Sequence, residues 1–222
     1  MSESLIVYKA NNHLEASSCL SNLLITEINK SKEDNFSIGL SGGNTPKITY
    51  SLLRNDIKDF SRIIFWTVDE RWVPQDNESS NQKLVNSIFS DSGAKILEVE
   101  YSGISADEDA KKYSATITNN INTFDTVILG VGEDGHIASL FPETDAINDS
   151  DNIYVSNEVN VLSKWRVTAT FKLLQEVKNV YLLVTGSNKK EVLQTIMNNG
   201  DTSANKLINE RSQTFLVTDQ EI

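Results

Sequence analysis

A single histidine follows a glycine-rich turn in the stretch ILGVGEDGHIASLFP, which covers residues 128–142. This residue, His136, is one of two histidines in the chain. Imidazole can accept a proton near neutral pH, which is the property that a general base needs. Asp134 lies two residues earlier, where its carboxylate could orient the imidazole or position a water molecule. The spacing predicts a histidine base assisted by an aspartate.

The same stretch also fits G-x-G-x-x-G between Gly130 and Gly135, the pattern of a dinucleotide-binding turn. In such a turn the third glycine opens a helix whose N-terminus holds the pyrophosphate. Here Pro142 follows before two helical turns are complete, and a proline inside a helix costs about 3 kcal/mol. The pattern therefore indicates a loop that positions a histidine, without a dinucleotide site.

A second glycine-rich stretch, LSGGNTP, covers residues 40–46 and suits a phosphate group. Gly42 and Gly43 let the backbone turn tightly and approach an anion closely. Ser41 and Asn44 add side-chain donors, and the N–H groups at the start of the next helix favour an anion. A plain strand-to-helix turn would use the same residues, so the stretch alone leaves both interpretations open.

Basic residues at element junctions supply the remaining chemistry. The formal net charge is −11, so an anionic substrate requires a local basic cluster. Arg71 ends the Asp69-Glu70-Arg71 run after a buried apolar segment, and Asp69 or Glu70 could fix Arg71 or bind a sugar hydroxyl. Arg166 and Lys189 stand at similar junctions. We expect Arg71, Arg166 and Lys189 to form one basic cluster.

Short apolar runs alternate with amphipathic stretches along the chain. The expected strands are Leu5–Tyr8, Phe36–Leu40, Ile63–Val68, Thr126–Val131, Val180–Thr185 and Phe215–Thr218. The expected helices are Leu14–Asn29, Pro46–Leu53, Asn81–Phe89, Ala106–Asn119 and Lys189–Asn198, with one further strand and helix pair at Val167–Thr170 and Phe171–Val177. Unbroken apolar strands separated by helices predict an α/β fold: a doubly wound, mostly parallel sheet with helices on both faces. Ligands of such sheets bind beyond the carboxyl ends of the strands.

Composition narrows the classes of protein further. The acid excess argues against nucleic-acid binding, and no run approaches the roughly 18 apolar residues of a membrane span. With Cys19 as the one cysteine, no internal disulfide forms, and no signal peptide is evident, so a cytoplasmic location is expected. We expect residues 1–222 to form a single α/β domain.

Together these motifs resemble 6-phosphogluconolactonases. The resemblance rests on SGGNTP (residues 41–46), DERWVP (69–74) with Ser80-Asn81, GVGEDGHIASLFP (130–142), WRVTAT (165–170) and GSNKKEVL (186–193). The closest alternative is glucosamine-6-phosphate deaminase, whose histidine loop is similar to DGHIAFNEP and whose first loop is similar to PTGGTP. The stretches present here favour the lactonase.

The resemblance implies hydrolysis of a phosphosugar lactone without metal or cofactor, in a Rossmann-like fold. His136 would be the base and Asp134 its assistant. Ser41, Gly42, Gly43, Asn44, Asp69, Arg71, Arg166 and Lys189 would line the site and bind substrate. The choice between Lys189 and Lys190 stays open, although the G-x-x-K spacing favours Lys189. No residue is assigned in the C-terminal segment, and a sugar-phosphate sensor without turnover is a further alternative.

Overall fold

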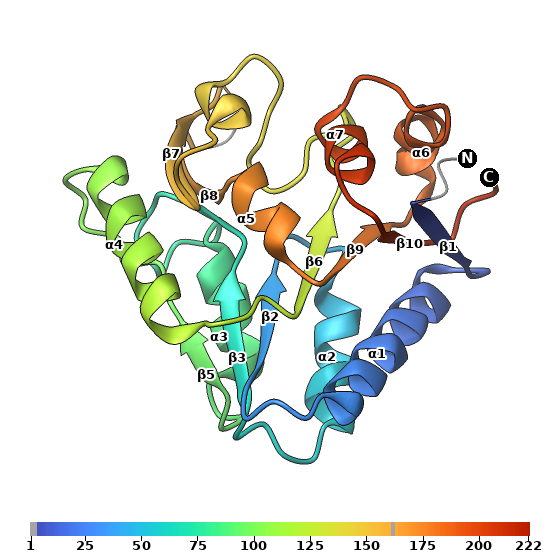
Figure 1. The fold of residues 1–222 in the computed structure, drawn as a ribbon, viewed down its shortest axis with the longest axis horizontal. Coiled ribbons are helices and arrows are strands. Elements are labelled where there is room, and N and C mark those ends of the chain that lie inside the picture. Colours follow the sequence, from blue (N-terminus) through green and yellow to red (C-terminus); the bar gives the residue numbers. More distant parts are fainter. Residues whose placement is uncertain (1–3, 161–162) are drawn as a thin grey trace.

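The computed structural model describes residues 4–160 and 163–222 and contains a seven-stranded parallel sheet (Figure 1). Every neighbouring pair of strands in this sheet is parallel. The strands are, in spatial order, β1 (Leu5–Lys9), β10 (Thr214–Thr218), β9 (Asn179–Val184), β6 (Thr126–Gly130), β2 (Phe36–Leu40), β3 (Ile63–Thr67) and β5 (Lys95–Leu97). Six of the seven correspond to strands that the sequence predicts; β5 is the addition.

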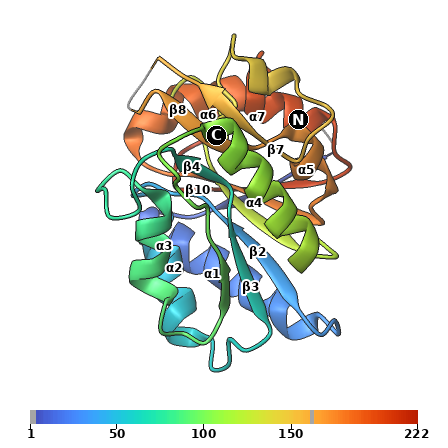
Figure 2. The same ribbon diagram turned by 90° about the vertical axis from the view of Figure 1, so that its left-hand side faces the viewer.

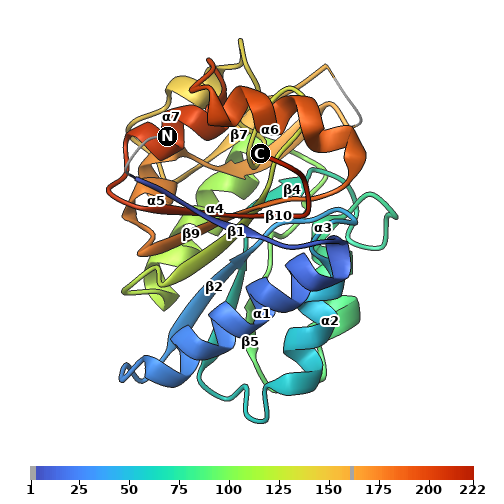
Figure 3. The same cartoon turned by 90° about the vertical axis from the view of Figure 1, so that its right-hand side faces the viewer.

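Helices cover both faces of this sheet (Figures 2 and 3). One face carries α1 (His13–Lys30), α2 (Lys47–Asp56) and α3 (Asn81–Phe89); the other carries α4 (Ala106–Asn120), α5 (Phe171–Glu176), α6 (Lys190–Met197) and α7 (Ser203–Asn209). All of β3 is buried, and its side chains alternate between the two layers. Phe65 packs in the layer of α1–α3, whereas Ile64 and Trp66 pack with α4. The doubly wound fold is confirmed.

A smaller antiparallel sheet of three strands lies beside the main one. It consists of β4 (Asp69–Arg71), β8 (Trp165–Ala169) and β7 (Tyr154–Glu158), in that order. The predicted strand at residues 167–170 is therefore real, but it belongs to this sheet. The run at residues 69–71 is itself a strand, which continues from β3 through the buried Val68. The small sheet thus starts where β3 ends.

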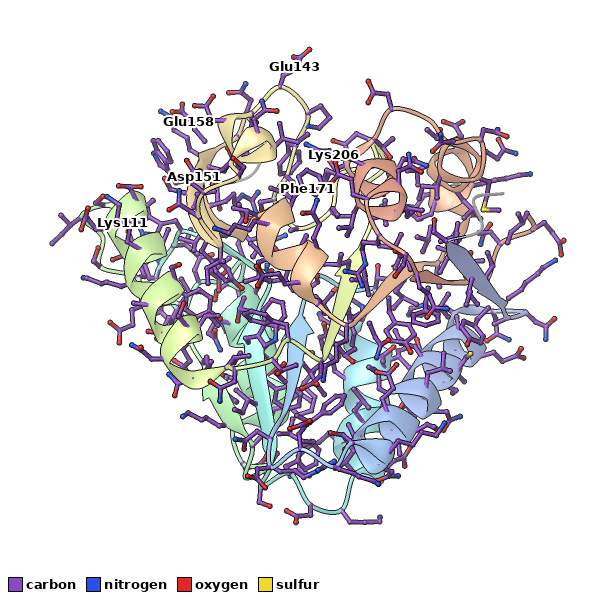
Figure 4. The ribbon with its side chains drawn as sticks, in the orientation of Figure 1. Lys111, Glu143, Asp151, Glu158, Phe171 and Lys206 are labelled. Carbon is purple, nitrogen blue, oxygen red and sulfur yellow. The ribbon has the colours of Figure 1, made fainter. Side chains whose placement is uncertain are left out.

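The C-terminal helices differ most from expectation. Lys189 does not begin a regular helix, because it ends a short 3₁₀ turn over Ser187–Lys189, and α6 starts one residue later. Helix α7 was not predicted; Lys206 on α7 lies over the ring of Phe171 on α5, 4.4 Å from its centroid (Figure 4). A further 3₁₀ turn covers Asp145–Asn148. No helix within residues 4–160 and 163–222 is long and apolar enough to cross a membrane.

Candidate active site

A cavity lies at the carboxyl edge of the parallel sheet, towards which the arrowheads of β2, β3 and β6 point in Figure 1. It consists of two adjoining hollows that share Asp69, Arg71, Gly132, His136, Ala138 and Lys189. The larger hollow has a volume of about 500 Å³, which lies within the range of ordinary small-molecule sites. Segments that follow four different strands therefore meet around one space.

His136 lines both hollows of the cavity and presents one ring nitrogen to Asp134. Its Nδ1 lies 2.5 Å from Oδ1 of Asp134, and its backbone N–H donates to the same oxygen at 3.2 Å. Burial acts to raise the pKa of Asp134, but the hydrogen bonds from His136 outweigh it and lower that pKa. An ionised carboxylate only accepts, so Nδ1 carries the hydrogen, and in the neutral imidazole the free lone pair is on Nε2. Among the described residues, Nε2 has no hydrogen-bond partner.

Two glycines shape the turn that carries this histidine. A Cβ on Gly132 would lie 2.1 Å from Nδ1 of His136 and 2.6 Å from Oδ1 of Asp134, so only glycine fits beside the pair. Gly135 has a φ of +83°, and a Cβ there would lie 2.5 Å from the Thr202 side chain. The N–H of Gly132 closes the turn by donating to the His136 carbonyl at 2.8 Å. Both glycines are therefore required by the conformation of the loop that carries His136.

Three cationic side chains border the cavity. Arg71 on β4 and Arg166 on β8 are paired in register across the small sheet. Burial, and repulsion from Arg71, lower the pKa of Arg166, while the charge of Asp69 opposes this shift. Like charges directly opposite each other destabilise a sheet, so this pair suits a site that receives an anion. Lys189, from the turn before α6, also lines both hollows, whereas Lys190 lines neither.

The acidic residues of β4 have distinct surroundings. Asp69 is 7% exposed, lines the cavity and accepts a 2.6 Å hydrogen bond from the Ser139 hydroxyl. Glu70 points away and accepts from the backbone N–H groups of Asn81 and Gln82 at the start of α3. Burial raises the pKa of Glu70, against the lowering effect of these bonds. Glu70 therefore braces α3, and Ser139 has its hydroxyl committed to Asp69.

The SGGNT segment contributes unequally to the cavity. Ser41, Gly42 and Gly43 line it, and Gly43 has the positive φ of +87° that glycine permits. Asn44 is exposed and lies outside the lining of both hollows, whereas Thr45 lines one of them. The structure thus brings together nine of the ten residues expected at the site, Asn44 being the one that lies apart.

Comparison with known proteins identifies the family. Residues 12–216 match a family model described as glucosamine-6-phosphate isomerases/6-phosphogluconolactonase. Over 166 residues, 72% of this chain, the sequence is 34% identical to the 6-phosphogluconolactonase of Chlamydia pneumoniae. The chain belongs to this family of enzymes.

Solved structures are similar to this chain over nearly its whole length. A 6-phosphogluconolactonase from Thermotoga maritima has a TM-score of 0.84 at 26% identity, covering 97% of this chain and 98% of that one. One from Trypanosoma cruzi has a TM-score of 0.88 at 25% identity, covering 98% and 96%. The match with the chlamydial relative spans 64% of that protein, which is less than two thirds of its length.

In this family member, α7 anchors the histidine loop, although no residue of the C-terminal segment was expected at the site. The Ser203 hydroxyl donates to the Leu140 carbonyl at 2.6 Å, and the Ala204 N–H donates to the Gly135 carbonyl at 3.1 Å. Thr202 caps the helix by accepting from the Asn205 N–H at 3.1 Å. A threonine in this position is a helix-start signal in the sequence, but its partner loop is some 60 residues away and only the fold shows it.

Proposed function

We propose that this chain hydrolyses 6-phospho-D-glucono-1,5-lactone to 6-phosphogluconate, with His136 as the general base. The observation that carries the proposal is the arrangement of His136: Asp134 holds Nδ1 at 2.5 Å, and His136 lines a cavity that cationic side chains border. A base next to an anion-binding space suits hydrolysis of a phosphorylated ester. The names of the relatives support the same reaction.

In the proposed reaction, Nε2 of His136 takes a proton from a water molecule while the water oxygen attacks the lactone carbonyl carbon. The negative charge that develops on the carbonyl oxygen is stabilised by nearby cationic side chains. The ring C–O bond then breaks, and the departing oxygen takes the proton from the imidazolium. Asp134 keeps the hydrogen on Nδ1 throughout, so that Nε2 remains the acceptor.

Substrate binding is assigned to the residues around the base. Arg71, Arg166 and Lys189 attract the phosphate and the developing oxyanion, since guanidinium groups match such oxygens with paired donors. Ser41, Gly42 and Gly43 add donors from the first hollow, and Asp69 accepts from a sugar hydroxyl. Asn44 keeps a role only if its exposed side chain turns towards bound substrate.

The family description also covers glucosamine-6-phosphate isomerases. The isomerase-type stretch DGHIAFNEP has a glutamate at the position of Phe141, which stacks on His136 here. One carboxylate, that of Asp134, hydrogen-bonds the imidazole within the described residues. A single base with one orienting acid supports hydrolysis over isomerisation.

The test supplies wild-type protein with lactone generated in situ by glucose-6-phosphate dehydrogenase and detects product through 6-phosphogluconate dehydrogenase. A parallel sample receives glucosamine 6-phosphate and is assayed for ammonia. We expect acceleration over spontaneous lactone hydrolysis and no ammonia. Ammonia release without lactone hydrolysis would replace this proposal by the isomerase, and sugar-phosphate binding without either activity would favour the sensor.

A further inference from the structure

Phe141 stacks directly on the imidazole of His136. The two ring centroids are 3.9 Å apart and the planes are inclined by 28°. Phe141 is half-buried and lines the larger hollow of the cavity. Nothing in the mechanism described above uses this ring, although it is in contact with the proposed base.

The backbone around Phe141 is held from two sides. The carbonyl of Phe141 accepts a 2.8 Å hydrogen bond from the Thr144 hydroxyl. The carbonyl just before it, that of Leu140, accepts from Ser203 of α7 at 2.6 Å. Pro142, which follows, has a fixed φ. The aromatic ring therefore sits on an anchored segment and can act as a rigid support.

His136 needs such a support because a single hydrogen bond does not fix an imidazole. The bond from Nδ1 to Asp134 restrains one point of the ring, and the ring can still tilt about it. Half-exposed Asp134 can itself move, since 48% of its side chain is accessible. Gly132 closes the space beside Nδ1 and Cε1. Contact with a flat aromatic face restricts the remaining tilt, because at a centroid separation of 3.9 Å further tilting would bring atoms of the two rings into collision.

We infer that Phe141 is a positioning residue that keeps Nε2 of His136 directed into the cavity and keeps the imidazole in its Nδ1–H form. The inference rests on the proposed function of His136, but it concerns the geometry of the ring and is measurable without turnover. Removal of the aromatic face would let the imidazole tilt away from Asp134. Both tautomers would then be populated, and fewer molecules would hold an acceptor nitrogen towards the bound lactone.

The kinetic test compares Phe141→Leu with Phe141→Tyr and with Phe215→Leu. Phe215 is a matched control, since it is also half-buried and stacks on an aromatic ring, that of Tyr181, at 4.8 Å and 18°. A misplacement of about 1 Å can cost roughly 10²-fold in rate, so Phe141→Leu should lose about 10- to 100-fold in kcat while KM changes little. Phe141→Tyr, which keeps the ring, should retain wild-type kcat. Phe215→Leu should retain it too.

The second readout is the imidazole itself, measured by ¹⁵N NMR at a pH of about 8, where histidine is neutral. With two histidines in the chain, a His13→Gln variant assigns the signals. We expect one Nδ1–H tautomer of His136 in wild type and in Phe141→Tyr, and a mixture in Phe141→Leu.

The two readouts separate the possible failures. An unchanged tautomer and an unchanged kcat in Phe141→Leu would overturn the inference, as would an equal loss of kcat in Phe215→Leu. A folded wild type that shows the tautomer difference but does not hydrolyse the lactone would remove the proposed function and leave the positioning role in place. Thermal unfolding of all variants checks that Phe141→Leu folds. If it does not fold, Phe141→Tyr still tests the inference, because a loss of kcat or of the Nδ1–H tautomer in that variant would overturn it.

Discussion

Both ends of the parallel sheet are hollowed, and the cationic residues that line these spaces lie at the carboxyl end. The amino end, before β2, β3 and β6, is lined by Glu33, Asp34 and Asp125. The carboxyl end is lined by three cations as well as three acids: Arg71, Arg166 and Lys189 with Asp69, Glu133 and Asp134. The difference matters because a hollow alone does not make a site; the groups that face it do.

At the amino end the buried charge is committed to the protein. Asp125 accepts from the Ser37 backbone N–H and from the Lys178 ammonium, each at 2.9 Å, so it ties β2 to the chain before β6. At the carboxyl end, His136 lines the cavity, and its Nε2 has no hydrogen-bond partner among the described residues. The comparison teaches that saturated polar groups hold the fold, whereas groups aimed at a cavity are available for chemistry.

The largest difference between the two ends is expected when one methyl group is added at each of them. Gly132→Ala places a Cβ within 2.1 Å of the His136 ring, and the displacement should lower kcat for the lactone by about 10²-fold. Gly93→Ala, before β5 at the amino end, meets no atom within 4 Å but has a φ of +89°. It should cost about 1 kcal/mol of stability and leave kcat unchanged. Steady-state kinetics and urea unfolding measure both; an active Gly132→Ala enzyme would contradict the account.

A second variant removes one cation from the carboxyl end. Hydrogen bonds to charged groups contribute about 1.5–3 kcal/mol, so Arg166→Met should raise KM by about 10- to 100-fold. Because Arg166 is 4% exposed and paired in register with Arg71, thermal unfolding must accompany the kinetics to show that the variant is folded. An unchanged KM in a folded variant would remove Arg166 from substrate binding.

A third variant tests the amino end. Asp125→Asn weakens the acceptor for Ser37 and Lys178, and we expect a loss of about 1–3 kcal/mol in the free energy of unfolding. Asp34→Asn is the control, since Asp34 is exposed in the same hollow and should change stability by less than about 0.5 kcal/mol. Neither variant should alter kcat or KM. A kinetic defect in Asp125→Asn would show that the two ends are coupled.

The smallest effect is in stability at acid pH. The pKa of Asp134 is lowered in the folded protein from its usual value of 3.8, so the unfolded chain binds the proton more readily. Asp134 therefore stabilises the fold above pH 3.8, and this contribution disappears as the pH falls through the lowered pKa. Since the carboxylate is half-exposed, the effect should stay under about 1 kcal/mol. The unfolding temperatures of wild type and Asp134→Asn should converge below the lowered pKa. A difference between them that grows at lower pH would contradict this stabilising role of the Asp134 carboxylate.

Much of the fold is predictable because its strands are buried on both faces. Phe36–Leu40 is an unbroken buried strand with the predicted bounds, and the predicted Asn81–Phe89 helix also has them, with Ser80 as its cap. Turns after such strands could be located in advance, which is why the segments of His136, Ser41 and Arg71 were expected at one edge.

The rest depends on contacts between distant residues. The charged run Asp69–Arg71 has the composition of a solvated turn, and it is a strand only because it pairs with Trp165–Ala169. Strand β5 is three residues long and partly exposed, too short for a pattern. The roles of Ser203 and Phe141 follow from partners that the local sequence does not reveal.

The central claim is that His136 is the base, and the chain offers its own control. His13, the other histidine, begins α1 and hydrogen-bonds the Thr185 hydroxyl at 2.8 Å, outside the cavity lining. Lactone hydrolysis by wild type, His136→Ala and His13→Ala should be compared after subtraction of the spontaneous rate. We predict a loss of about 10²–10⁴-fold in kcat for His136→Ala, with KM nearly unchanged and His13→Ala as active as wild type. Equal activity of wild type and His136→Ala would contradict the account.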